Sequence, residues 1–401
     1  MSLLFDESMK KIKLIFKIVG IYLDRRITNT TEHIIKFRSL CLINIVWLGT
    51  CIAGEVVWII DGILTGKSLQ EITYMVPCTT YCTLACITYF NVLLNENKVN
   101  NLCKQLRDIE NNNMDHIGSN EVENKIISKY KKNLKTVINV VITLNALTVI
   151  SFVASTLVLI GMDYVNTGEI MLQLPFLVAY PFDPYYIKYW PIAYVHQVWT
   201  TTLVAFAILG TDCLLCTCCT SICIQFRLLQ KQFETIIPER SFNGNIFLDK
   251  LKKLVDRHEK IIQAVALLEY IYTKLTLLNF VSSSLLICLT GFNVAATRDI
   301  VVIITFLTFL LMSLLRTYLL CFCGDMVMTS STGVSNAVYN SKWYTVNAMT
   351  AKYLHVIQMR AQLPSKLTAY GFADVNMVAF SRILSTAWSY FTLLNTMESS
   401  T

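Results

Sequence analysis

The chain has 401 residues, of which 54% are hydrophobic and only 15% are charged, and its mean hydropathy is +0.51. A soluble domain carries roughly a quarter charged residues, so this composition excludes a soluble protein and indicates an integral membrane protein. The formal net charge of +7 does not indicate a nucleic-acid partner, because the basic residues are divided among separate loops.

The N-terminal segment, residues 1–37, holds a short hydrophobic stretch, LIFKIVGIYL, that does not resemble a cleavable signal peptide. Lys17 interrupts this stretch, and Lys10, Lys11 and Lys13 come just before it. Apolar residues mixed with lysines in this way predict an amphipathic or re-entrant helix at the inner membrane surface.

Six hydrophobic segments follow, and each is long enough to cross about 30 Å of hydrocarbon at ~1.5 Å per residue. Glu55 interrupts the first of them, and Arg316 interrupts the last. The six segments are residues 39–60, 72–95, 136–162, 189–211, 275–297 and 300–324.

A seventh segment, residues 367–397, carries many polar side chains among its aromatic and aliphatic ones. Asp374, Arg382, Ser389 and Asn395 are examples. Ionisable groups at membrane depth usually face a bundle interior or water. We therefore predict that this helix lines a water-filled path. The alternative is a peripheral helix whose polar groups reach the two membrane surfaces.

Seven crossings put the two chain ends on opposite sides of the membrane, and the Lys and Arg residues assign the sides. The four segments expected inside hold 28 of them, whereas the three loops expected outside hold one each, at Lys67, Lys188 and Arg298. The N-terminus is therefore predicted to be cytoplasmic and the C-terminus extracellular. A G-protein-coupled receptor has the opposite orientation, which argues against that class.

The outer loop after the third span is rich in proline and aromatic residues. This composition predicts a stiff loop, either a lid over an apolar cavity or an interfacial aromatic belt. On the inner side, the helical pattern of the fourth span continues to about residue 233. Two further stretches, residues 247–273 and 348–362, also have helical patterns. These extensions predict a cytoplasmic helical bundle that is available to other subunits.

No catalytic or metal-binding pattern is found in the sequence, so we expect neither an enzyme nor a cofactor. The thiols of residues 213–223 have C-x-x-C spacing, but they continue a membrane helix without converging histidines, and cysteine is a good small hydrophobe there. A transporter is a further alternative, but it would be expected to show internal repeats, and none is seen.

The chain resembles the insect odorant receptors over its whole length, most specifically in its last 65 residues. The resemblance includes Tyr339 and Trp343 before the final helix, Pro364, the small-residue turn 369–371 and the ending Ser-Tyr-Phe-Thr-Leu-Leu at residues 389–394. Gustatory relatives end with Thr-Tyr, five residues and Gln-Phe. Here Thr396 and Met397 take the last two places, which favours the odorant family.

This resemblance implies an all-α membrane protein that is one subunit of an odorant-gated, non-selective cation channel. The subunit would assemble as a heterotetramer with the family's co-receptor in the plasma membrane of an olfactory neuron, surrounded by lipid. Residues 1–37 would be cytoplasmic, 38–325 would hold six spans and the odorant pocket, 326–365 the cytoplasmic anchor, and 366–401 the pore helix. A gustatory-type or metabotropic seven-helix chemoreceptor is the alternative.

Site residues follow from the resemblance together with helical spacing. The pore and its gate are predicted at Leu393, Asn395, Thr396 and Glu398, and the subunit anchor at Tyr339, Trp343 and Tyr344. The pocket for a small volatile molecule is predicted in the outer half of spans two, three, four and six. Its predicted residues are Cys78, Tyr81, Cys82, Phe152, Ser155, Leu159, Trp199, Thr202, Phe206, Ile303 and Phe306. For each of them, plain packing between helices is the alternative.

Overall fold

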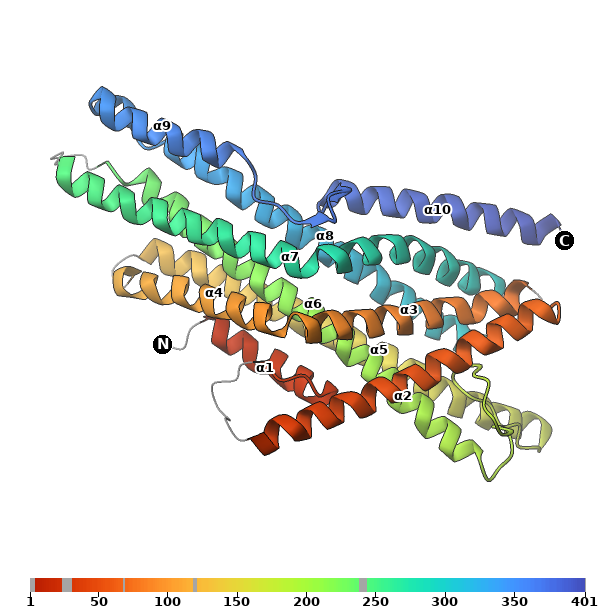
Figure 1. Ribbon diagram of the computed structural model, residues 1–401. Helices are drawn as coiled ribbons and strands as arrows, with labels where there is room; N and C mark the ends of the chain where they lie inside the picture. The colour runs from red at the N-terminus through yellow and green to blue at the C-terminus, as the bar shows by residue number, and fades with distance from the viewer. Residues whose placement is uncertain (1–3, 24–30, 68, 118–120, 238–243, 401) are drawn as a thin grey trace.

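The computed structural model describes residues 4–23, 31–67, 69–117, 121–237 and 244–400, and the chain is almost entirely helical there (Figure 1). The helices are α1 Leu4–Val19, α2 Thr31–Leu64, α3 Leu69–Leu94, α4 Glu96–Ile117, α5 Glu121–Thr167, α6 Trp190–Glu234, α7 Gly244–Ala296, α8 Ile300–Tyr339, α9 Ala348–Gln362 and α10 Met377–Ser400. A single 3-10 turn, η1 Trp343–Thr345, precedes α9, and the hairpin of β1 Thr368–Ala369 and β2 Ala373–Asp374 precedes α10.

The long helices lie side by side in one elongated bundle (Figure 1). We call the end with α4, α9 and the start of α7 the anchor end. The opposite end, with the loop of residues 168–189, is the loop end. Helix α1 lies nearer the anchor end, and α10 ends at the loop end (Figure 1).

Four helices are much longer than a membrane crossing requires. Helices α5, α6, α7 and α8 have 47, 45, 53 and 40 residues, whereas about 20 residues cross the hydrocarbon. Their excess length lies toward the anchor end, where α4 and α9 pack against them. This confirms the predicted helical extensions, including the helix over residues 348–362.

Helix α6 is the centre of the bundle. It contacts α1, α2, α3, α4, α5, α7 and α8, and almost every side chain from Leu203 to Gln230 is buried. Its cysteines from Cys213 to Cys223 pack in this core. A helix that is buried all round shows no amphipathic stripe in its sequence.

The N-terminal helix is amphipathic as predicted, but its location differs from the prediction. Its apolar face, including Phe5, Ile12 and Phe16, is buried in the protein core rather than resting only on a membrane surface. Phe16 contacts α6 at Gly210, where an added Cβ would lie 3.0 Å from the ring. Small size at Gly210 therefore lets α1 pack closely against the central helix.

Residues 367–397 were treated as one helical segment in the sequence analysis, although the resemblance also implied a turn at residues 369–371. Residues 368–374 form the hairpin, and α10 begins only at Met377. The hairpin is held against α7, because the Thr273 hydroxyl donates to the Thr368 carbonyl at 3.1 Å and accepts from the Tyr370 amide at 2.8 Å. Asp374, expected in the membrane helix, instead forms an ion pair with Lys366 at 2.8 Å.

Six helices among the described residues are long and apolar enough to span a membrane: α2, α3, α5, α6, α7 and α8. Helix α10 is long enough to cross, but its charge and hydroxyl groups make it less apolar than these six. It lies along one edge of the bundle, against α7 and α8 (Figure 1).

Candidate functional site

A small cavity lies between α3, α5, α6 and α8, and Phe176 of the loop of residues 168–189 forms part of its wall. It is lined by Cys78, Tyr81, Cys82, Asn145, Thr148, Val149, Phe152, Phe176, Thr200, Thr201, Val204, Ala205, Phe309 and Met312. The lining is mostly apolar and aromatic, with a few hydroxyl and amide groups, as in sites for small organic molecules. Its volume is about 50 Å³, whereas such sites usually measure roughly 300–1,000 Å³. A ligand of several heavy atoms therefore has to displace side chains as it binds.

Aromatic rings make up the wall that has to move. Phe152 stacks on Phe176 with ring centroids 5.4 Å apart and meets Phe309 edge-on at 5.8 Å. Tyr81 meets the same Phe309 ring edge-on at 5.1 Å. These contacts join α3, α5, α8 and the loop, so a molecule that separates the rings pushes on all four elements.

The loop over the cavity is firmly tied to its neighbours. The buried Gln197 amide accepts from the Phe176 amide at 2.9 Å and donates to its carbonyl at 3.0 Å. Burial raises the pKa of Tyr180 to about 12, so its hydroxyl stays protonated beside His196 Nδ1 at 3.0 Å. Tyr185 and Tyr186 further along are exposed. The loop is thus a lid in its first half and presents an aromatic surface in its second half.

The close approach of the lid to α2 depends on Gly54. A Cβ at this position would overlap the Val178 side chain and lie 2.9 Å from the Ala179 carbonyl oxygen. Overpacking of this kind typically costs about 1–3 kcal/mol. Gly49 is on the same helix and has nothing within 4 Å of its Cβ position among the described residues.

We therefore expect Gly54→Ala to displace the lid and change the ligand concentration for half-maximal response, whereas Gly49→Ala leaves it unchanged. Dose–response curves for the two variants, at matched surface expression, test this. Equal curves for Gly54→Ala and the wild type would show that the lid position does not affect binding.

A buried carboxyl group lies directly behind the cavity wall. The Glu55 side chain has no exposed surface, and its Oε1 accepts weak hydrogen bonds from the thiols of Cys51 at 3.7 Å and Cys82 at 3.9 Å. Its Oε2 has no hydrogen-bond partner among the residues that the structure describes. Because Cys82 also lines the cavity, Glu55 is separated from the cavity by one small side chain.

Four of the eleven predicted pocket residues line the cavity: Cys78, Tyr81, Cys82 and Phe152. Phe306 lies behind the wall, where its ring meets Phe152 at 6.4 Å and Tyr74 at 4.9 Å. The other predicted residues are outside the lining: Ser155, Leu159, Trp199, Thr202, Phe206 and Ile303. Whether a ligand contacts any of these residues stays a prediction.

The predicted and observed lining residues differ for two geometric reasons. The cavity lies about one to two helical turns closer to the anchor end than predicted, so α5 contributes Asn145 to Phe152 and α8 contributes Phe309 and Met312. On α6 the lining residues include Thr200 and Val204, each offset from the predicted residues by one or two positions. One position turns a helix face by about 100°.

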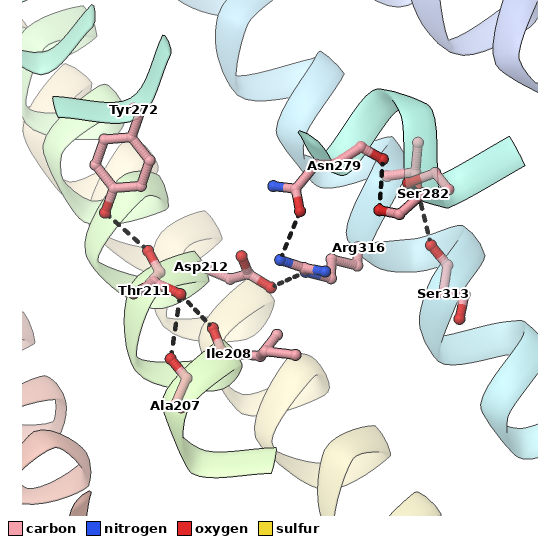
Figure 2. Close-up of polar contacts among 11 residues, drawn as sticks. Ala207, Ile208, Thr211, Asp212, Tyr272, Asn279, Ser282, Ser313 and Arg316 are labelled. Carbon is pink, nitrogen blue, oxygen red and sulfur yellow. Dashed lines mark hydrogen bonds and ion pairs between the residues drawn. The ribbon is translucent and has the colours of Figure 1, made fainter. Parts of the chain in front are cut away.

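An ion pair between α6 and α8, which Figure 2 shows, was missed in the sequence analysis and lies near the cavity residue Tyr81. Arg316 Nε of α8 donates to Asp212 Oδ2 of α6 at 2.8 Å, and Arg316 Nη2 donates to Asn279 Oδ1 of α7 at 3.0 Å. The two charged side chains are only 9% and 21% exposed. The guanidinium also lies 5.9 Å from the Tyr81 ring centroid. One side chain thus joins the cavity wall to α6 and α7.

The predicted pore residues lie on the side of α10 that faces away from the bundle. Ala379, Ile383 and Ala387 are buried against α7 and α8, whereas Leu393 is 57% exposed. The exposed side also carries Arg382, Ser385, Ser389, Asn395 and Thr396. The side chain of Glu398, also predicted at the pore mouth, lies outside the described residues. On a helix that crosses a membrane, an exposed stripe that carries a charge and hydroxyl groups is expected to face water or another chain.

The predicted anchor residues Tyr339, Trp343 and Tyr344 are also exposed. Helix α9 buries Leu354 and Ile357 against the bundle and exposes a second apolar stripe on its other side. That stripe consists of Met349, Tyr353, Val356, Met359 and Leu363. Exposed apolar surfaces of this kind occur at sites of contact with another protein or with a membrane.

Residues 68–388 match the sequence profile described as 7tm Odorant receptor. The chain belongs to this odorant receptor family. The receptor is similar to Odorant receptor 67c of Drosophila melanogaster, with 25% identity over 98% of this chain and 97% of the relative. It is also 22% identical to Putative odorant receptor 92a of Drosophila melanogaster, over 98% of this chain and 95% of the relative.

The receptor also shares the fold of a solved member of the insect olfactory receptors. It matches OR5 of Machilis hrabei in complex with eugenol, with a TM-score of 0.83, 19% identity and coverage of 98% of both chains. The match to the same protein without the ligand has a TM-score of 0.82 over 97% of both chains. The fold class predicted from the sequence is therefore confirmed.

Proposed function

We propose that this odorant receptor is one subunit of a heteromeric, odorant-gated cation channel in the plasma membrane, assembled with a co-receptor subunit. A small volatile molecule binds in the cavity around Phe152, and the bound molecule favours an open pore lined by α10. The observation that carries the proposal is the continuous path from the cavity through Arg316 to α7, against which α10 packs.

The cavity supports an apolar ligand with few polar groups. Its aromatic lining offers burial and ring contacts, and its small volume means that binding is coupled to movement of the rings. A ligand that binds one arrangement of the helices better than the other shifts the equilibrium by that difference in affinity. Opening a pore from about 1% to 99% requires roughly 5.5 kcal/mol of such differential binding, summed over the sites involved.

The polar edge of the cavity supports a ligand that carries a hydrogen-bond donor. The unpartnered Oε2 of Glu55 accepts such a donor once Cys82 moves aside. We expect Glu55→Met to reduce sensitivity to an alcohol about tenfold relative to a hydrocarbon of the same chain length, the size of one net hydrogen bond. Glu55→Gln keeps an acceptor oxygen and should retain most of the response. Equal loss for alcohol and hydrocarbon would contradict this role.

The pore is proposed to form where the exposed stripes of α10 from neighbouring subunits face one another. A ring of leucines at Leu393 closes such a pore by excluding water, and Thr396 and Asn395 lie beside it on the exposed surface. The exposed apolar stripe of α9 and the residues around Trp343 supply the contact between subunits at the anchor end. The excess of Lys and Arg at that end favours the cytoplasmic side.

Electrical recording tests this function. In cells that express the receptor together with a co-receptor subunit, a panel of volatile compounds is expected to evoke cation currents within milliseconds, even under G-protein blockade. Currents that vanish under G-protein blockade would overturn the channel proposal in favour of a metabotropic one.

A further inference from the structure

A second and larger cavity lies at the anchor end, between α4, α6 and α7. Its volume is about 500 Å³, within the usual range of roughly 300–1,000 Å³ for small-molecule sites. It shares no lining residue with the odorant cavity. Its lining is strongly basic and includes Lys250, Lys253, Arg257 and Lys260, all from α7.

Little negative charge opposes these four cations within the described residues. Asp256 is the carboxylate in the lining, and it pairs with Lys260 at 2.7 Å. The buried Glu123 of α5 is a second carboxylate that interacts with Arg257. The positive charges therefore exceed the negative ones, which leaves the cavity attractive to an anion.

Arg257 is held in place by neutral groups rather than by a bound carboxylate. Its Nη1 donates to Gln232 Oε1 at 2.7 Å, and its Nη2 donates to Gln225 Oε1 at 3.0 Å. Its Nε atom is buried and has no hydrogen-bond partner among the described residues. A fixed guanidinium with a free donor is a ready partner for phosphate oxygens.

The distance of this cavity from the membrane indicates the source of the anion. Arg257 comes 18 residues before Leu275, the start of the apolar part of α7, and α7 is continuous between them. At ~1.5 Å per residue this places Arg257 about 27 Å beyond the hydrocarbon, whereas lipid headgroups extend only about 5–8 Å. A lipid headgroup therefore does not reach the cavity, but a dissolved molecule does.

We propose that this cavity binds a soluble polyphosphate anion of the inositol phosphate type. The anion contacts Arg257 and the neighbouring lysines of α7, and it reaches Gln232 and Thr235 at the end of α6. Binding thereby fastens α6 to α7 at the end of the bundle where α9 offers its exposed stripe. The inference does not depend on the channel function.

Binding of inositol hexakisphosphate to the purified full-length receptor, in nanodiscs of phosphatidylcholine, tests the proposal. We expect saturable binding by calorimetry and a rise in Tm, both weakened by added salt. Lys250→Gln combined with Lys253→Gln should weaken binding by about tenfold or more, because it removes two charge-assisted contacts. The matched control is Lys129→Gln with Lys132→Gln on α5, where both lysines are exposed, and it should bind as the wild type does.

Absence of saturable binding, or equal weakening by both double variants, would overturn the site. Arg257→Gln is expected to abolish the Tm shift. If that variant does not fold, the two lysine pairs still decide the question, because all four lysines are on the surface or the cavity rim.

Nanodiscs that contain a phosphatidylinositol bisphosphate distinguish a lipid headgroup from a soluble anion as the ligand. The assignment to a soluble anion would be overturned if this lipid competed with inositol hexakisphosphate for the wild-type receptor and if the competition disappeared in the Lys250→Gln, Lys253→Gln variant.

Discussion

Replacing Arg316 with methionine is expected to destabilise the receptor by up to about 3–5 kcal/mol, because it leaves the largely buried Asp212 without its partner. The loss should appear as a lower Tm of the purified protein and as little receptor at the cell surface. Arg382→Met on α10 makes the same change at an exposed residue and should leave Tm unchanged.

The double variant Asp212→Leu with Arg316→Met separates folding from signal transmission. Replacing both members of a buried ion pair by apolar residues is often neutral for stability. The double variant should therefore recover surface expression, yet respond weakly to odorant because the link from Tyr81 through Arg316 to Asn279 is gone. A double variant with the wild-type dose response would show that the ion pair serves stability alone.

Replacing Leu393 with serine is expected to raise the current in the absence of odorant. An exposed leucine contributes little to the fold of its own subunit. In the proposed pore, when closed, it is buried against the last helices of the neighbouring subunits and contributes roughly 1.5–3 kcal/mol. Losing that burial shifts the ratio of closed to open channels by about tenfold or more. Whole-cell recording without odorant, normalised to the current at saturating odorant, measures the shift.

Leu394→Ser is the matched control for the gate. Leu394 is half-buried and lies on the side of α10 that packs against α7 and α8, as Ala387 does about two turns earlier. Its replacement should lower surface expression without raising the basal current. A basal current that rises equally in both variants would place the gate elsewhere.

The helices could be predicted from the sequence because their apolar runs are long and their caps and breaks are local. The helix over residues 348–362 is an example, since Asn347 caps its start by accepting from the Thr350 amide at 2.9 Å. The start of α10 could not be predicted. The hairpin before it depends on contacts with distant residues, such as Thr368 with Glu269 at 2.6 Å.

The lining of the cavity could likewise be predicted where the sequence has a local pattern, and not where it depends on contacts between distant residues. The face of α3 with Cys78, Tyr81 and Cys82 was predictable, because one side of that helix is apolar at helical spacing. The face of α6 was not, because α6 is buried all round and its sequence has no periodicity to indicate one side. Asp212 and Arg316 stand 104 positions apart, and only the packed bundle brings them together. The signal available in the sequence was the presence of two opposite charges within apolar spans, which would have indicated this ion pair.

Locating α10 in the proposed channel tests the account most directly. Ser389→Cys lies on the exposed side of α10, in the same stripe as Leu393. In the assembled channel, a membrane-impermeant thiol reagent applied with odorant is expected to block most of the current through Ser389→Cys and little of the wild-type current. A current that is unaffected at Ser389→Cys, with the thiol instead labelled by a lipid-soluble reagent, would place α10 on the lipid-facing surface and contradict a pore built from this helix.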